Sequence, residues 1–427
     1  MTTVRRAAAA LIASALGFLA STTPLVPQDI VSVRATEENK AKLARTPLDL
    51  LMEWDHKLYL VLAPGDVSRL QSLGIPFALE TGRLAVTPPP SAAFSQGGLN
   101  GAYHSYAELE RELLDIARDY PAIAKLFRLG TTLEGRTIYA LKISDRPELN
   151  EDEPEVLFLG CHHAREWITV EIPLLLARYL TGEYGRDENV RNRVDSAEVW
   201  IVPLVNPDGL EYSIQTYRWW RKNRRLNVDG SYGVDLNRNY GYQWGADDEG
   251  SSPAPVSDVF RGREPFSEPE TSIVRGLCES RDFRVAVSYH NFSQLILYAW
   301  GWTRRPSPNA AEYAAMAARM ADLIRPVNGR DYTPEPACSL YLTNGDTVDY
   351  ITGTLGIPAF TIELPPLDIV HGGFMNAESD ISSVFAENLP AMLYLIDDAR
   401  QKFAASGDGE RPGRPAKPKK GKLDALK

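Results

Sequence analysis

The sequence predicts an α/β fold in which one sheet is buried on both faces by helices, preceded by a smaller α/β unit. Continuous apolar, β-branched runs alternate with segments of helical periodicity from about residue 105 to residue 400. Strands of this kind belong to sheets that are covered on both faces. Before them, shorter segments follow one another in the order βαββαβ, which is the order of a split βαβ, ferredoxin-like fold.

The smaller unit is expected between about residues 30 and 86. A stretch rich in proline, serine and glycine follows at residues 88–99, and this composition predicts an exposed linker. The predicted strands of the unit are residues 30–34, 48–54, 57–62 and 77–79, and its predicted helices are residues 37–45 and 66–73.

The larger unit opens with a helix start signal. Ser105 precedes an apolar-periodic run and Glu108 follows three residues later, a capping-box pattern for a helix that ends near Pro121. In chain order, the five predicted core strands are residues 137–143, 156–160, 199–204, 285–288 and 359–362. The predicted helices include residues 170–180, 269–278, 310–324 and 382–400.

Composition limits the classes of protein that the chain can represent. With 427 residues, 44% of them hydrophobic, it can bury a sizeable core. Its formal net charge of −10 argues against a nucleic-acid binder, which would carry a basic surface. Residues 404–427 form a basic tail that we expect to be disordered. Cys161, Cys278 and Cys338 can form at most one disulfide and are too far apart in sequence for a metal motif.

The N-terminus has the pattern of a secretory signal. Arg5 and Arg6 precede an apolar run over residues 7–20, which predicts a signal peptide at residues 1–22. The run is shorter than the ~20 residues that a membrane-spanning helix needs, so a retained anchor is the less favoured alternative.

Potential metal ligands stand at the ends of three predicted core strands. The second strand runs into His162 and His163, the fourth into His290 and the fifth into Glu363. In open α/β sheets the functional crevice lies outside the carboxyl ends of the strands. A single histidine at a strand end is more often an ordinary hydrogen-bonded residue, but a spaced set at three strand ends is expected to converge on one site.

Two histidines and a carboxylate form the ligand set of catalytic zinc in peptidases. The candidate ligands here are His163, Glu166 and His290. Side chains alternate in direction at a strand end, so His162 and His163 cannot easily face one metal. His163 has the suitable spacing to Glu166, and His162 is expected to pack behind the site. Glu363 would then be a free carboxylate near the metal, suited to act as general base on a zinc-bound water.

Seven short segments of the chain follow one another in an order that is typical of one family. They are residues 163–168 (HAREWI), 205–209 (VNPDG), 220–222 (WRK), 234–239 (VDLNRN), 288–294 (SYHNFSQ), 340–341 (LY) with Asp349, and 360–364 (FTIEL). With these segments the chain resembles the zinc carboxypeptidase family, the carboxypeptidase A and carboxypeptidase T-like metallocarboxypeptidases. The resemblance spans roughly residues 100–400 and implies a mixed central sheet flanked by helices on both faces.

The resemblance implies a zinc-dependent metallocarboxypeptidase that hydrolyses the C-terminal peptide bond of peptides and proteins. One Zn²⁺ would be bound by His163, Glu166 and His290. Glu363 would act as general base and acid, and Arg221 would polarise the scissile carbonyl, a role that suits a guanidinium aimed at developing negative charge.

The same resemblance implies a binding site for the free C-terminus of the substrate. Asn237, Arg238 and Tyr341 would hold its carboxylate, and Arg238 suits this role because a guanidinium can pair bidentately with a carboxylate. Arg165 would bind the peptide in the neighbouring subsite. The alternative for Arg221 and Arg238 is that they are solvated surface charges.

The resemblance leaves two alternatives for the C-terminal residue that the specificity pocket prefers. Val348 at the pocket floor favours apolar C-terminal residues, whereas Asp346 could pair with lysine or arginine. Alternatively, Asp346 only caps a turn, since Asn344-Gly345-Asp346 is a good turn sequence. The implied pocket residues are Leu297, Gly301, Thr343, Asp346, Val348 and Thr361.

The resulting domain organisation is a signal peptide (1–22), a ferredoxin-like pro-segment (23–87), a linker (88–99), the catalytic domain (100–403) and the tail (404–427). We expect a secreted or periplasmic, monomeric zymogen that acts on peptides with free C-termini and binds neither nucleic acid nor, after signal removal, membranes. The alternative for the pro-segment is a folding helper or a permanent accessory domain without an inhibitory role. The alternative function is a zinc-dependent cell-wall peptide peptidase or an N-acyl amino acid deacylase on the same scaffold.

Overall fold

A computed structural model describes residues 30–43, 46, 48–54, 56–62, 65–80 and 100–405 of the chain. The predicted signal peptide, the predicted linker and nearly all of the predicted basic tail lie outside these residues. The chain divides into two compact units, Met1–Arg83 and Leu84–Lys427, and each is described by itself.

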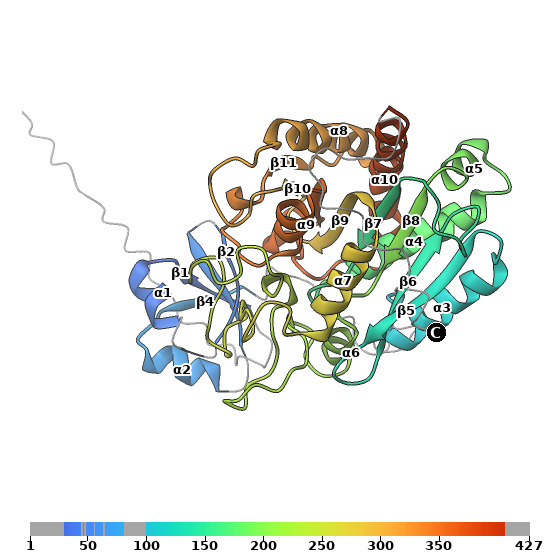
Figure 1. Ribbon diagram of the computed structural model, residues 1–427. Coiled ribbons are helices and arrows are strands. Elements are labelled where there is room, and N and C mark those ends of the chain that lie inside the picture. The colour runs from blue at the N-terminus through green and yellow to red at the C-terminus, as the bar shows by residue number, and fades with distance from the viewer. Residues whose placement is uncertain are drawn as a thin grey trace, which may run out of the picture. The chain divides into compact units, whose positions relative to one another are not determined.

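The first unit has the strand order of a ferredoxin-like fold. Its four strands form one sheet in the order β2-β3-β1-β4, in which neighbouring strands are antiparallel. Alternate apolar side chains of β1 and β3 pack with Leu70 of α2 in a small core. This confirms the predicted order of elements, which are β1 (Ile30–Arg34), α1 (Glu37–Leu43), β2 (Asp49–Trp54), β3 (Lys57–Val61), α2 (Asp66–Ser72) and β4 (Phe77–Leu79) (Figure 1).

The second unit is built on a mixed sheet of eight strands in the order β11-β10-β12-β9-β7-β8-β6-β5. The central strands are buried along their whole length, which explains their continuous apolar sequences. The strands are β5 (Ala124–Thr131), β6 (Thr137–Ile143), β7 (Glu155–Leu159), β8 (Glu198–Val202), β9 (Phe283–Asn291), β10 (Leu295–Tyr298), β11 (Thr333–Pro336) and β12 (Ala359–Leu364).

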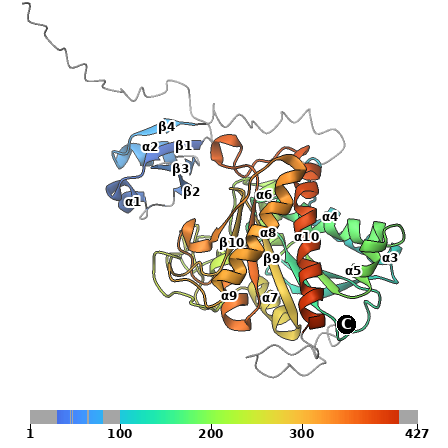
Figure 2. The ribbon, with the colours of Figure 1, turned by 90° about the horizontal axis from the view of Figure 1, so that it is seen from above.

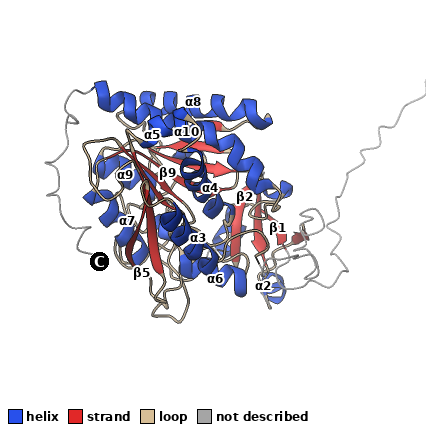
Figure 3. Cartoon of the chain, turned by 90° about the vertical axis from the view of Figure 1, so that its right-hand side faces the viewer, coloured by secondary structure: helices blue, strands red, loops and turns tan. Residues whose placement is uncertain are grey.

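Helices cover both faces of this sheet, as the sequence predicted (Figures 2 and 3). One face packs against α3 (Tyr106–Asp119), α4 (Ile168–Glu183), α8 (Ala310–Asn328) and α10 (Asp380–Ala405) in a large apolar core. A second core on the other face includes α7 (Pro269–Ser280) and α9 (Thr347–Leu355). The capping box that starts α3 is present, with the Ser105 side chain accepting from the Glu108 backbone N–H.

Several short elements were not predicted. They are β5, β10, β11 and the helices α5 (Glu188–Val194) and α6 (Pro207–Gln215), together with α9. The strands β10 and β11 have only four residues each and lie at one edge of the sheet, so no period of alternation can develop in them. All three cysteines are free. Among the described residues, no helix is long and apolar enough to cross a membrane.

The strand pairing decides where the strand ends meet. β7, β9 and β12 are adjacent and mutually parallel, so their carboxyl ends lie at one edge of the sheet. Glu363 of β12 is in register with His290 of β9. β7 ends four residues before His163, and the side chains predicted to form the site therefore come together at this edge.

Candidate metal centre and active site

A tight turn after β7 presents His163 and Glu166 to the site. Gly160 is required there, because a Cβ at this position would lie 2.2 Å from the Thr169 carbonyl oxygen and 2.6 Å from that of Pro203. The Thr169 hydroxyl accepts from the Cys161 N–H at 3.0 Å and donates to the Glu166 carbonyl at 2.6 Å. These bonds fix the turn before α4 begins.

His163, Glu166 and His290 form a compact buried group whose potential ligand atoms all lie within 4.8 Å of one another. The Glu166 carboxylate lies 2.8 Å from His163 Nδ1 and 3.1 Å from His290 Nδ1. The two Nδ1 atoms are themselves 3.1 Å apart. Burial opposes ionisation of Glu166, but the two imidazoles hold its pKa below its ordinary value. Two imidazole nitrogens and one carboxylate facing a common point fit the donor set of a zinc ion.

The outer ring nitrogens of both histidines are also held in place. His163 Nε2 lies 3.1 Å from Asp235 Oδ1, and His290 Nε2 lies 3.1 Å from the Ser288 hydroxyl. Such outer partners orient metal-binding histidines and fix their tautomer. Asp235 was not identified from the sequence as a functional residue. Its only sequence signal is its place inside the family-like segment 234–239, one residue before the buried Leu236.

Asp235 links the metal group, which is the set of His163, Glu166 and His290, to Arg221. Its Oδ2 accepts from Arg221 Nε at 3.0 Å and from Arg221 Nη2 at 2.8 Å. Burial opposes the charge on Asp235, yet Arg221 and His163 hold the pKa of this carboxyl well below its ordinary value. An ionised Asp235 thus orients both an imidazole and a guanidinium.

Replacing Asp235 by asparagine should lower zinc affinity by ~10–100-fold, the usual effect of losing such an outer partner. Competition with a chromogenic zinc chelator measures this affinity. Asp229→Asn is the matched control, because Asp229 is an exposed carboxylate that bonds only to Ser231 among the described residues. Equal zinc affinities in the two variants would contradict the role given to Asp235.

Glu363 lies beside the metal group but is not part of it. It is in register with His290, and its side chain is buried. Burial raises the pKa of Glu363 well above its ordinary value, the nearby Glu166 carboxylate adds to this effect, and Arg221 opposes it. A carboxyl group in such surroundings holds a proton more readily than an exposed glutamate does, which suits a group that transfers protons.

His162 is buried beside this group but is not part of it. Its Nε2 lies 2.9 Å from the Tyr240 hydroxyl and 3.1 Å from Thr347 Oγ1, and its Nδ1 lies 3.2 Å from Ser288 Oγ. Burial, reinforced by His290 and His163, lowers the pKa of His162 well below its ordinary value, so it stays neutral. Both of its ring nitrogens are engaged, which leaves neither of them for a metal.

Asn237 and Arg238 lie together on a short 3₁₀ turn, Leu236–Arg238. The Asn237 side-chain oxygen accepts from the Thr347 N–H at 2.9 Å and the Thr347 hydroxyl at 2.8 Å, which turns the amide NH₂ outward. Arg238 is buried and donates to the carbonyls of Gly250 and Asn237. The Arg238 guanidinium lies 5.8 Å from the ring of the half-exposed Tyr341.

Asp346 is the N-cap of α9, where its Oδ1 accepts from the Asp349 N–H at 2.8 Å. Its Oδ2 accepts from the Thr343 hydroxyl at 2.6 Å. The sequence offered the capping of a turn as one alternative for Asp346; in the structure Asp346 caps the start of a helix. Gly301 lies against the same group, because a Cβ there would be 2.9 Å from Asp346 Oδ2. Val348 is buried in the same helix.

Arg165 lies on the turn that carries the metal group but points away from it. Its guanidinium stacks 4.2 Å from the ring centre of Phe374 and reaches Asp258 at 3.5 Å. It is thus a buried cation on the same turn as the candidate metal ligands.

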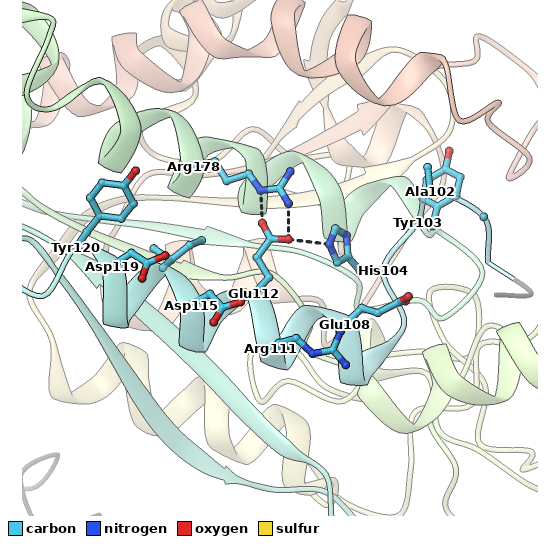
Figure 4. A pocket seen from close by; sticks show the side chains of 12 residues that line it. Ala102, Tyr103, His104, Glu108, Arg111, Glu112, Asp115, Asp119, Tyr120 and Arg178 are labelled. Atoms are coloured by element: carbon cyan, nitrogen blue, oxygen red, sulfur yellow. Dashed lines mark hydrogen bonds and ion pairs between the residues drawn. The ribbon is translucent and has the colours of Figure 1, made fainter. Parts of the chain in front are cut away.

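A polar cleft of about 460 Å³ lies between α3 and α4 and shares no lining residue with the three candidate metal ligands. Figure 4 shows Glu112 between Arg178 and His104. His104 also bonds to Glu171 on α4 at 2.8 Å. Burial alone would lower the pKa of His104, but hydrogen bonds to Glu112 and Glu171 raise it to about 10. His104 is therefore an imidazolium that ties the start of the unit to α4.

Because the folded pKa of His104 lies above its ordinary value of 6.5, its charge stabilises the fold fully below pH 6.5 and loses this effect as the pH rises toward 10. His104→Gln should lower the Tm by several degrees at pH 6, and the difference from wild type should shrink steadily up to pH 9.5. Thermal melts of both proteins across this range measure it. A Tm difference that does not change with pH would contradict the assignment.

A buried group of two histidines and a glutamate at the carboxyl edge of an α/β sheet, with a further carboxylate and an arginine beside it, defines a zinc-peptidase type of site. Comparison with known proteins agrees with this class. The family model described as zinc carboxypeptidase matches residues 109–391. The chain belongs to the zinc carboxypeptidase family and is a zinc-dependent metallocarboxypeptidase.

Individual relatives support this membership. The chain is 32% identical over 356 residues to a zinc carboxypeptidase of Saccharothrix mutabilis subsp. capreolus, covering 78% of this chain and 80% of that one. It is 35% identical over 272 residues to metallocarboxypeptidase A of Trichophyton tonsurans. This match covers 62% of this chain and 64% of the Trichophyton protein, so less than two thirds of that relative is matched.

Solved structures show the same fold. The crystal structure of thrombin activatable fibrinolysis inhibitor superposes with a TM-score of 0.74 at 25% identity, covering 88% of this chain and 99% of that one. The carboxypeptidase A from Helicoverpa armigera superposes with a TM-score of 0.71 at 24% identity, covering 90% and 99%, and at this identity it supports the fold alone.

Proposed function

We propose that this metallocarboxypeptidase binds one Zn²⁺ through His163, Glu166 and His290 and removes single residues from the free C-termini of peptides. The observation that carries the zinc site is the close approach of His163 Nδ1, His290 Nδ1 and the Glu166 carboxylate, with both outer ring nitrogens already oriented. When bound, zinc acts as a Lewis acid and lowers the pKa of water.

The residues around the metal group transfer the proton, polarise the scissile carbonyl and bind the terminal carboxylate of the substrate. Glu363 takes a proton from the attacking water and returns it to the leaving amine. Arg221, held by Asp235, donates to the scissile carbonyl oxygen as negative charge develops there. Asn237, Arg238 and Tyr341 bind the terminal carboxylate, which places the last peptide bond against Glu363.

We propose further that the C-terminal side chain is apolar. Both oxygens of Asp346 already accept hydrogen bonds from the protein, so this carboxylate has less acceptor capacity left for a basic side chain of the substrate. Val348 and Leu297 are buried apolar members of the same set of residues. Arg165 is assigned to the neighbouring subsite, beside Phe374.

The experiment for this function combines metal analysis with an assay. The catalytic unit, released by limited proteolysis near residues 88–99, should contain one zinc per chain by mass spectrometry of the metal. It should hydrolyse N-blocked dipeptides that end in phenylalanine or leucine faster than those ending in lysine. Removal of the metal should abolish the activity and added Zn²⁺ should restore it. A zinc-free, fully active chain would overturn the proposal.

The first unit is proposed to be an inhibitory pro-segment of a secreted or periplasmic, monomeric precursor. Its ferredoxin-like fold is separate from the catalytic unit, and the intervening sequence is rich in proline, serine and glycine, which makes it a good protease target. A precursor starting at residue 30 should therefore be nearly inactive, and cleavage within residues 88–99 should activate it. Equal rates on a blocked dipeptide before and after a nick confirmed by mass would contradict this role.

A further inference from the structure

The two arginines that the proposed function assigns to the substrate lie on segments that are bonded to each other. Arg221 lies two residues before Asn223, and Arg238 lies four residues after Val234. The Asn223 N–H donates to the Val234 carbonyl at 3.1 Å, and the Asn223 side-chain oxygen accepts from the Val234 N–H at 2.8 Å. These two bonds hold the backbone that carries Arg221 beside the backbone that leads to Arg238.

Both segments are also bonded to Glu268, the N-cap residue of α7. Glu268 Oε2 accepts from the Asn223 side-chain NH₂ at 2.7 Å. The Glu268 N–H donates at 3.2 Å to the side-chain oxygen of Asn239, which directly follows Arg238. The Thr271 hydroxyl donates to the same Asn239 oxygen at 2.7 Å. All of these side chains are buried, so the bonds are stronger than they would be in water.

Glu268 forms an ion pair with Arg225. Arg225 Nε donates to both carboxylate oxygens at 2.7 Å, and the Ser267 hydroxyl donates to Oε1 at 2.7 Å. A hydrogen bond to an ionised group is shorter and stronger than one between neutral groups. Glu270 also accepts from Asn223, at 3.2 Å, but burial, reinforced by Glu268, raises the pKa of Glu270 to about 8. Glu268 is therefore the stronger of the two carboxyl partners of Asn223 at neutral pH.

We propose that Glu268 is a positioning residue that sets the separation between Arg221 and Arg238. In the proposed function, Arg238 binds the terminal carboxylate and Arg221 acts on the scissile carbonyl, which lies one residue away in the substrate. The separation of the two guanidinium groups must therefore match a single residue. A misplacement of ~1 Å can lower the rate of such a reaction by ~100-fold. This inference rests on the proposed function, because it requires both arginines to bind the substrate.

The test compares Glu268→Gln with wild type, each as the zinc-loaded full chain after cleavage within residues 88–99. The amide keeps the shape of the carboxylate but removes the ion pair with Arg225. We expect kcat/KM on a blocked dipeptide with a free C-terminus to fall by ~10- to 100-fold, mostly through kcat, because the scissile bond is no longer aligned. Zinc content should stay at one per chain, since Glu268 is not among the candidate ligands.

A milder variant covers the case in which Glu268→Gln does not fold. Thr271→Val removes only the hydroxyl that donates to Asn239 and keeps the size of the side chain. It should lower kcat in the same direction by about threefold or more, as expected for the loss of one hydrogen bond.

A double-mutant cycle separates positioning from a general loss of structure. In an Arg221→Gln background the arginine that Glu268 positions is absent, so Glu268→Gln should lower kcat/KM by less than ~3-fold. Glu387→Gln is the matched control, because Glu387 on α10 is also fully buried and pairs with Arg330 at 2.8 Å. It should lower the Tm but keep the wild-type kcat/KM.

The outcomes distinguish this inference from the proposed function. Wild-type kcat/KM in both Glu268→Gln and Thr271→Val, an undiminished effect in the Arg221→Gln background, or an equal loss in Glu387→Gln would overturn the positioning role. If Arg221→Gln and Arg238→Gln each turned over normally, the proposed function itself would be wrong. If both were impaired while Glu268→Gln was not, only the positioning role would fail.

Discussion

Glu363→Gln should retain zinc and lose turnover by ~10²–10⁴-fold, the range expected for removal of a general base. The amide keeps the shape of the carboxylate but cannot accept a proton from water. Glu363 is buried beside Glu166 and Arg221 and has no place among the three candidate ligands, so the metal group should be unaffected. The measurements are zinc content after dialysis and kcat/KM on a blocked dipeptide.

Two further variants test whether the loss of turnover is specific to Glu363. Glu378→Gln, at an exposed position, should behave as wild type. His290→Ala should instead lose zinc, and its activity should fall together with its metal content. If Glu363→Gln turned over at a near-normal rate, or if it lost zinc, Glu363 would not be the base.

Conversion of a substrate's C-terminal carboxylate to an amide should lower kcat/KM by roughly 30- to 5,000-fold, which corresponds to ~2–5 kcal/mol for losing one partner of a buried charge pair. The reason is the arrangement around Arg238, whose guanidinium is held by the carbonyls of Gly250 and Asn237. Binding of the carboxylate also positions the scissile bond, so kcat should fall as well as affinity.

A comparison of two enzymes with two substrates isolates the contribution of Arg238. Arg238→Gln should weaken cleavage of the acid strongly and cleavage of the amide only slightly, so that the two substrates become similar. The matched pair is a blocked dipeptide and its C-terminal amide. Equal cleavage of acid and amide by the wild-type enzyme would point instead to an amidase or an endopeptidase.

The main elements of both units could be predicted from the sequence because their patterns are local. Buried strands such as β6 and β7 are continuous apolar runs, and Ser105 with Glu108 forms the capping box that marks the start of α3. Short edge elements such as β10 and β11 could not, because four residues carry no period and their pairing partners lie far away in the chain.

The identity of the candidate metal ligands was also determined by the sequence alone, through residue type, strand-end position and the spacing of His163 and Glu166. What only the tertiary structure decided is how these groups are held. Asp235 lies 72 positions from the histidine that it contacts, and no local pattern marks it. The capping of α9 by Asp346 was likewise decided by folding. The physical reason is that hydrogen bonds and charge pairing act between atoms a few ångströms apart, whatever their separation along the chain, whereas periodicity reports only on neighbours in sequence.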